Sequence, residues 1–286
     1  MDKQCNNGGK VQALSNNMKK RIRPILIVTI LLVTCCTPIN DKPQNPTPNN
    51  NVDSDLIYIP AGEFQIWNDQ VDNKTEHTVF LDSFYISQYE ITNAEYTDCV
   101  NSGVCKAPKV PLSFTRSEYY GNHEFDNYPV VFVDWNSATS YCKWRGWRLP
   151  TETEWEKAAR GTKGMKYPWG NLFDNTVANI DRTHDDTTLV GAYEKGKSPY
   201  GIYDMIGNVW EWTQDWYSDD YYYTVQHKNP QGPEQGEKRV IRGGSFEDPS
   251  YKDERYAGDP ASPTYRFGWS PEKSNQFIGF RCATSP

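Results

Sequence analysis

The sequence has no long hydrophobic run. Its longest apolar stretch, Ile25–Val33, has nine residues, whereas a helix that crosses a bilayer needs about 20. The basic cluster Lys19–Arg23 precedes this stretch, and a basic segment followed by a short apolar one is typical of an export signal. We therefore predict a signal segment over residues 1–35, with Met18 as an alternative start.

Basic side chains are in deficit. The chain carries 30 Lys and Arg against 37 Asp and Glu, a formal net charge of -7. Six of the basic residues lie in the first 34 positions, so the rest of the chain is more acidic still. Because such a surface repels phosphate backbones, the composition disfavours nucleic-acid binding, and we expect no nucleic-acid partner.

Histidine is also scarce, and its positions do not suggest a catalytic site. The four histidines are scattered, with no spacing typical of metal ligands: His77, His123, His184 and His227. We interpret each as a surface or hydrogen-bonded side chain, and we predict no catalytic residue from them.

Two adjacent cysteines follow the apolar stretch. Leu32–Cys36 is similar to the bacterial lipobox, in which the first mature residue is a lipid-modified cysteine. We therefore expect lipidation at Cys35 or Cys36 and a bacterial cell-envelope location, with a secreted protein as the alternative. Residues 36–55 are rich in Asn, Pro and Asp, which is typical of a flexible tether.

Four cysteines remain in the rest of the chain, and an even number in an exported domain predicts disulfides with three possible pairings. Cys99 and Cys105 enclose a short loop that contains glycine, so a local bridge is natural. Cys142 and Cys282 would then form a second, long-range bridge. The alternative makes Cys99 and Cys105 a redox or metal-binding pair.

Residues 56–286 have the pattern of one α+β domain rich in loops. Thr92–Glu95 and Thr151–Glu154 are capping boxes that predict helix starts. Asn136 is expected to cap a third helix, and Pro129–Val133 is expected to be a short apolar strand.

The most unusual stretch of this domain is Gly201–Trp216, which holds three tryptophans and three acidic residues. Asp204, Glu211 and the backbone carbonyls of such a loop are hard oxygen donors of the kind that Ca²⁺ prefers. The alternative is a tight turn whose tryptophans fill the core.

Several motifs in this order resemble the formylglycine-generating enzyme, or sulfatase-modifying factor, family. They include Phe84–Asn93, Arg148–Glu156, Gly207–Trp212, Arg242–Phe246 and Gly279–Cys282. The resemblance covers residues 56–286 and implies a variant of the C-type lectin fold. It also implies a Cys142–Cys282 disulfide.

The resemblance further implies structural Ca²⁺. One site would use the side chains of Asp204 and Glu211 with the carbonyls of Gly207 and Val209. A second would use Asn179, the Ile180 carbonyl and an acid such as Asp185.

One departure from the family decides the expected function. Sulfatase-activating members bind copper through two cysteines, and the corresponding positions here are Gly258 and Pro263. Neither supplies a thiolate, and Glu247–Phe280 contains no Cys, Met or His, whereas Cu(I) needs soft ligands. We therefore expect no copper and no catalytic residue.

The expected role is a non-catalytic binding or scaffold module. Its protein or glycan ligand would contact aromatic residues of the variable segment near the C-terminus: Tyr251, Tyr256, Tyr265, Phe267 and Trp269. The alternatives are an oxidoreductase of the same family with a non-standard site, and a structural component of an envelope complex.

Overall fold

The computed structural model describes residues 55–68, 75–221, 226–249 and 259–286. The predicted signal segment, Cys35, Cys36 and all but the last residue of the predicted tether lie outside these ranges. Within them, no helix has the length and apolar character needed to cross a membrane.

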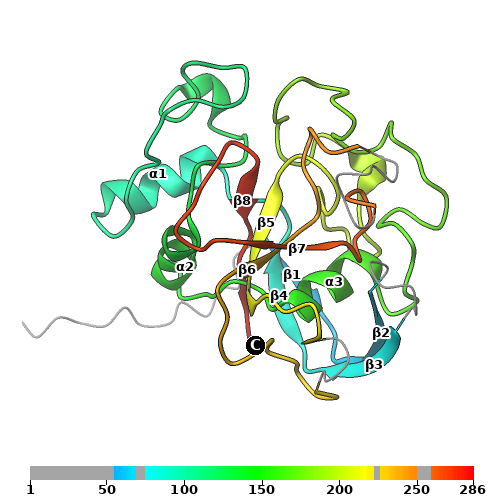
Figure 1. The fold of residues 1–286 in the computed structure, drawn as a ribbon. Coiled ribbons are helices and arrows are strands. Elements are labelled where there is room, and N and C mark those ends of the chain that lie inside the picture. The colour runs from blue at the N-terminus through cyan, green and yellow to red at the C-terminus, as the bar shows by residue number, and fades with distance from the viewer. Residues whose placement is uncertain (1–54, 69–74, 222–225, 250–258) are drawn as a thin grey trace, which may run out of the picture. The chain divides into compact units, whose positions relative to one another are not determined.

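The strands of the described residues form three small sheets (Figure 1). In the first, β4 (Phe84–Ser87) lies between β1 (Leu56–Ile59) and β9 (Ala283–Thr284), and both pairings are antiparallel. The second is the hairpin of β2 (Gly62–Asn68) and β3 (Thr75–Leu81).

The third sheet has the order β7-β6-β5-β8 and holds the candidate site. Its strands are β5 (Trp210–Trp216), β6 (Arg239–Arg242), β7 (Arg266–Trp269) and β8 (Ile278–Phe280). The pairing of β5 with β8 is parallel and the other two are antiparallel.

Capping residues determine where the three α-helices of the described residues begin. Thr92 closes a capping box at the start of α1 (Asn93–Asn101), and Thr151 does the same for α3 (Glu152–Arg160). Both predicted starts are confirmed. The helix α2 (Trp135–Trp144) begins earlier than predicted, because the carboxylate of Asp134, and not Asn136, accepts the hydrogen bond from the N–H of Ser137. Two short 3-10 helices, η1 (His123–Phe125) and η2 (Glu194–Gly196), lie in the loops.

The predicted strand at Pro129–Val133 is wrong. Only an isolated bridge between Thr92 and Pro129 forms there. Phe132 has a φ of 58°, which is incompatible with an extended strand. The segment is buried and apolar, so it packs in the core as irregular chain.

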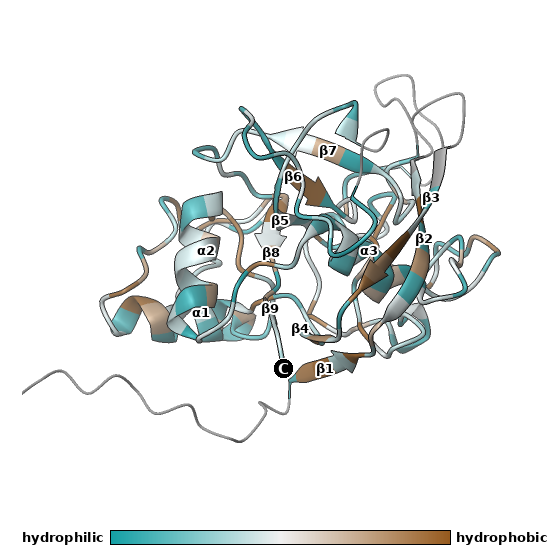
Figure 2. Cartoon of the chain, turned by 90° about the horizontal axis from the view of Figure 1, so that it is seen from below, coloured by the Kyte–Doolittle hydropathy of each residue, from teal (hydrophilic) through white to brown (hydrophobic). Residues whose placement is uncertain are grey.

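Two large hydrophobic clusters make up the core. One contains buried residues of α1, α2, β5 and β8, including Tyr96, Tyr141 and Trp212. The other lies between the β2–β3 hairpin and α3 and includes Trp155. In Figure 2 the strands β1 and β6 are coloured hydrophobic, in keeping with a core built largely on strands.

The helix α3 is charged and yet completely buried. Glu152 receives two hydrogen bonds from Arg266, at 2.8 and 2.7 Å. Glu156 receives hydrogen bonds from Arg160 and Arg242, both at 2.6 Å. Each buried carboxylate therefore has a guanidinium partner, as buried charges require.

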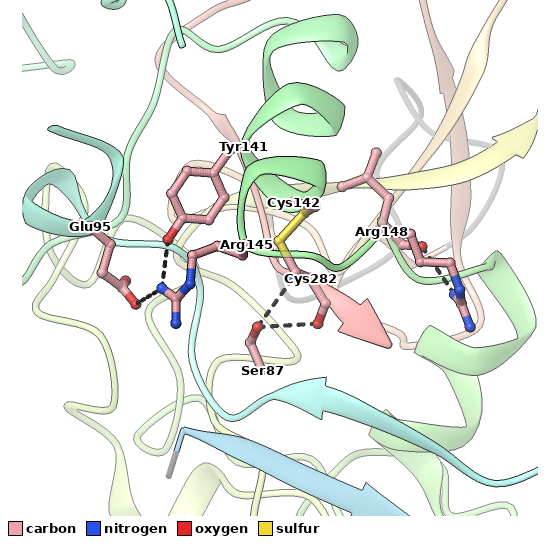
Figure 3. Close-up of a disulfide and its surroundings, with 8 residues drawn as sticks. Ser87, Glu95, Tyr141, Cys142, Arg145, Arg148 and Cys282 are labelled. Atoms are coloured by element: carbon pink, nitrogen blue, oxygen red, sulfur yellow. Dashed lines mark hydrogen bonds and ion pairs between the residues drawn. A yellow bond between two sulfur atoms is a disulfide. The ribbon is translucent and has the colours of Figure 1, made fainter. Parts of the chain in front are cut away.

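Both disulfides are present. Cys99 pairs with Cys105, so the redox or metal-binding alternative for these two is not what the structure has. Cys142 of α2 pairs with Cys282, 140 residues later. Figure 3 shows Ser87 beside this bridge; its hydroxyl accepts from the Cys282 N–H at 3.2 Å. The bridge thus joins α2 to the sheet that ends the chain.

Candidate functional site

The acid-rich loop before β5 packs against a second loop that was also predicted to bind metal. Gly207 has a φ of 81°, and a Cβ at this position would lie 2.3 Å from the carbonyl oxygen of Asn179. The N–H of Asn208 donates to the same carbonyl at 2.8 Å. Glycine is therefore required here, because the two backbones approach so closely.

Asp204 and Glu211 are both buried beside this contact. Asp204 accepts a hydrogen bond from the N–H of Gly191 at 2.6 Å. Burial, with a contribution from Glu211, raises the pKa of Asp204 to about 6. Glu211 accepts from Arg281 through both oxygens, at 2.7 and 2.6 Å, and from the Trp155 indole at 2.8 Å.

A third buried acid, Glu90, was missed in the sequence. Its carboxylate accepts from the side chain of Asn208 at 2.6 Å and from the N–H of Val209 at 3.3 Å. Burial, followed by repulsion from Asp204 and Glu211, raises the pKa of Glu90 well above its usual range. The Phe84–Asn93 motif contains Glu90, but nothing in its spacing indicated contact with a loop more than 110 residues away.

The first predicted calcium site stays a prediction. Both carboxylate oxygens of Glu211 already accept hydrogen bonds from Arg281. Asp204 lies among buried carboxylates, and burial is the main cause of its raised pKa, which the nearby Arg281 partly offsets. Within the described part of the chain, no group of three or more His, Cys, Asp and Glu converges as metal ligands. The predicted set does not need one, since it combines two carboxylates with the carbonyls of Gly207 and Val209.

The second predicted site fits less well. The Ile180 carbonyl already accepts from the N–H and the hydroxyl of Thr183, at 3.0 and 2.9 Å. Asp185 is exposed, and the carboxylate of its neighbour Asp186 accepts from Ser113 at 2.6 Å. The side-chain oxygen of Asn179 is buried without a hydrogen-bond partner among the described residues. One expected ligand atom is therefore unpaired, whereas Asp185 is exposed and Asp186 is already hydrogen-bonded.

A separate aromatic pocket of about 260 Å³ opens where β5, β7 and the chain before β8 meet. We call it the aromatic pocket; it is lined by Trp210, Ser245, Asp248, Phe267, Trp269, Asn275, Phe277 and their neighbours. None of the described residues that line it is Cys, His or Met. It therefore lacks the soft or imidazole ligands that copper prefers.

Asp248 organises one wall of the aromatic pocket. Its carboxylate accepts from the Trp210 indole at 2.8 Å and from the hydroxyl and N–H of Ser245, at 2.6 and 2.8 Å. On another wall, the indole nitrogen of Trp269 is buried without a hydrogen-bond partner in the described residues. The pocket thus combines the hydrogen-bonded carboxylate of Asp248 with the indole N–H of Trp269, which has no partner in the described residues.

Of the predicted contact residues, Phe267 and Trp269 line this pocket, and 38% of Phe267 is exposed. Tyr265 is a correction: it is 2% exposed and packs against Trp210 in the core. Tyr265 lies just before β7, where its ring contacts Trp210 in the core.

The remaining predicted positions of the variable segment lie outside the pocket or outside the described residues. Tyr251, Tyr256 and Gly258 belong to the latter group. Pro263 is buried, and its carbonyl accepts a hydrogen bond from Arg242 at 2.7 Å. Its backbone therefore helps to compensate the buried guanidinium of Arg242.

Phe114 extends the aromatic surface beside the pocket and was also missed. It is 40% exposed and packs against Phe246 and Phe277, with ring centroids 5.8 Å apart in both cases. Arg182 lies 5.4 Å from the same ring. No periodic pattern around Phe114 signals this contact, since the residue lies in an irregular loop.

Comparisons with known proteins agree with the motifs. Residues 42–286 match the model of the sulfatase-modifying factor enzyme 1-like domain. The chain is 32% identical over 289 residues to the formylglycine-generating enzyme of Mus musculus, covering 80% of this chain and 74% of that protein. It is 33% identical over 246 residues to the inactive C-alpha-formylglycine-generating enzyme 2 of Mus musculus, covering 81% of this chain and 74% of that protein.

It is also 34% identical over 260 residues to serine/threonine-protein kinase pkn1 of Chlamydia pneumoniae, covering 86% of this chain and 40% of that protein. This chain therefore spans about two-fifths of that chlamydial relative. Among solved structures, Treponema denticola variable protein 1 matches with a TM-score of 0.64 and 23% identity, covering 81% of this chain and 95% of that one. That likeness shows the fold, a variant of the C-type lectin fold.

Proposed function

Because the chain belongs to the sulfatase-modifying factor enzyme 1-like family, we propose that it is a non-catalytic member that binds a partner protein through the aromatic pocket. The ligand is a peptide segment that places an apolar side chain against Phe267 and a carbonyl group against the Trp269 indole. A family fold does not by itself imply the family's activity.

The observation that carries this proposal is the composition of the aromatic pocket. It combines aromatic surface with a buried indole N–H that has no hydrogen-bond partner in the described residues, and both features suit recognition of a peptide. The cysteines that could have served an oxidase are not available, because Cys99, Cys105, Cys142 and Cys282 are all in disulfides.

We further propose that Ca²⁺ stabilises the loop before β5. Asp204 and Glu211 would hold the ion with the carbonyls of Gly207 and Val209, and the ion would supply positive charge to a buried, acidic loop. Its role is structural, since the aromatic pocket shares no lining residue with this ligand set.

Export and lipid attachment at Cys35 or Cys36 complete the proposal. The basic and apolar segment before these cysteines supports an envelope location, with the domain held at the membrane by residues 36–55. Mass spectrometry of the membrane fraction, with each cysteine changed to serine in turn, tests the attachment.

The main experiment selects peptides from a displayed library on the purified protein and measures the selected peptide by calorimetry. Trp269→Phe keeps the ring and removes the N–H, so we expect about tenfold weaker binding. Phe267→Ala should weaken it by about 1–3 kcal/mol. Leu172→Ala is the control, because Leu172 is 84% exposed and does not line the pocket.

Two outcomes would count against the proposal. One is a selected peptide whose affinity is the same for wild type, Trp269→Phe and Phe267→Ala. The other is conversion of the cysteine of a sulfatase peptide to an aldehyde by the protein supplied with Cu(I) and O₂, which would favour the oxidoreductase alternative.

A further inference from the structure

A second groove, of about 640 Å³, lies between α2, the turn after it, the end of β5 and the chain that leads into β6. Three indoles line it, from Trp135, Trp147 and Trp216. We call it the tryptophan groove. It shares no lining residue with the aromatic pocket, and its volume is within the range of about 300–1,000 Å³ that is typical of ligand sites.

The floor of the tryptophan groove is held rigidly. The guanidinium of Arg239 lies 3.9 Å from the ring centroid of Trp135 and 3.4 Å from that of Trp216. Its Nη1 donates to the Gln214 carbonyl at 2.6 Å, and the Trp135 indole donates to the Thr213 carbonyl at 2.8 Å. A preformed surface of this kind loses little conformational freedom when it binds a ligand.

Among the described residues, two buried polar atoms of the groove have no hydrogen-bond partner. The hydroxyl oxygen of Thr139 and the Nε of Arg239 are buried without a hydrogen bond in the described residues. Buried polar groups are nearly always paired with protein or water. These two unpaired atoms therefore mark positions where a ligand can add a hydrogen bond.

The charge of the groove indicates a neutral ligand. Arg148 lines it, but its guanidinium is held by both oxygens of Glu154, at 2.6 and 2.7 Å. Lys143 and Glu234, of opposite sign, are exposed at the groove. The guanidinium of Arg239 is also positively charged, and it packs on the faces of two indoles.

The polar lining can both donate and accept hydrogen bonds. Three glutamine side chains line the groove, from Gln214, Gln226 and Gln231, and each amide carries one acceptor and two donors. A sugar hydroxyl also donates and accepts. The C–H face of a sugar ring carries slight positive charge, which complements the negative face of an indole.

We propose that the tryptophan groove binds a neutral oligosaccharide, with sugar rings against the indoles of Trp147 and Trp216 and a hydroxyl group between Thr139 and Arg239. An extended peptide is the less favoured ligand. Peptides commonly add main-chain hydrogen bonds to a free strand edge. The strand residues that line this groove lie on β5 and β6, which are paired with each other.

The test titrates the full-length protein, by tryptophan fluorescence and calorimetry, with chitotriose, cellotetraose, maltotetraose and xylotetraose, and with a proline decapeptide. We expect at least one oligosaccharide to bind saturably in the micromolar to millimolar range. Thr139→Val keeps the side-chain shape and removes the hydroxyl, so it should weaken binding about fivefold to tenfold and leave the melting temperature unchanged or higher.

Gln231→Ala should also weaken binding, because Gln231 is exposed and lines the groove. Phe267→Ala is the matched control in the aromatic pocket and should leave sugar binding unchanged, so failure here is distinguishable from failure of the peptide proposal. Three results would overturn the inference. One is that none of the four sugars binds saturably, and another is that wild type, Thr139→Val and Gln231→Ala bind a sugar equally well. The third is that only the decapeptide binds.

Discussion

Asp215→Asn should stabilise the protein, and more so as the pH rises. Asp215 lies on β5, completely buried, and one carboxylate oxygen accepts from the N–H of Glu152 at 2.8 Å. The other oxygen is buried without a hydrogen-bond partner in the described residues. Burial, followed by repulsion from Glu152, raises the pKa of Asp215 from 3.8 to about 8.

The size of the effect follows from this pKa. An acid whose pKa is higher in the folded state takes up a proton on folding, so stability falls as the pH rises from about 4 to about 8 and is then level. The free energy of unfolding falls by at most about 1.4 kcal/mol per pH unit. Above pH 8, the total loss from burying Asp215 is about 6 kcal/mol. Asparagine removes this cost but adds an unpaired N–H group worth about 1–3 kcal/mol.

We therefore expect a net gain of about 3–5 kcal/mol above pH 8 and little or no gain near pH 5. Urea unfolding with the disulfides intact, at half-unit steps from pH 4.5 to 9, measures the difference between variant and wild type. Asp220→Asn is the control, because Asp220 is exposed in the same segment. A difference that does not change with pH, or one that shrinks toward pH 9, would refute the reasoning.

Three further predictions concern the calcium loop and the long-range disulfide. Removing Ca²⁺ with a chelator should lower the melting temperature of the wild type, and Asp204→Asn should abolish that shift; equal shifts in both proteins would exclude Asp204 as a ligand. Gly207→Ala should destabilise the fold by several kcal/mol, because its Cβ would lie 2.3 Å from the Asn179 carbonyl at a positive φ; an unchanged urea midpoint would contradict this. Replacing Cys142 and Cys282 by serine should lower stability by about 5 kcal/mol, since the bridge closes a loop of 140 residues; a loss below about 1 kcal/mol would mean that the unfolded chain is not much restricted by it.

Local signals made much of the fold predictable. Thr92 and Thr151 each share reciprocal hydrogen bonds with a glutamate three residues on, and such a capping box depends on nearby residues alone. The choice between Asp134 and Asn136 as the cap of α2 was harder, because both residue types cap helices and they are two positions apart.

Features that depend on tertiary contact were not predictable. Pro129–Val133 is as apolar as a strand, but its place in the core leaves Phe132 in a left-handed conformation. The sequence did not show that Tyr265 is buried while Phe267 is exposed, because this depends on where β7 begins. Glu90 joins the acidic loop through contacts with residues 118 and 119 positions away, which a single sequence does not reveal.

The two tryptophan-lined cavities could not be predicted from the sequence either. Trp135, Trp147 and Trp216 come from three separate segments, and each has the sequence context of an ordinary core residue. Their convergence depends on the position of α2 beside the end of β5, and this is fixed by packing over the whole domain.

The small sheet β1-β4-β9 has a consequence for how this domain can be combined with others. The chain enters the domain through β1 and leaves it through β9, and both strands flank the same central strand. Entry and exit points that lie so close together allow a domain to be inserted into a longer polypeptide without disturbing its interior. A short glycine linker between Thr284 and Leu56, with new ends opened in an exposed loop, should accordingly yield a circular permutant that still folds.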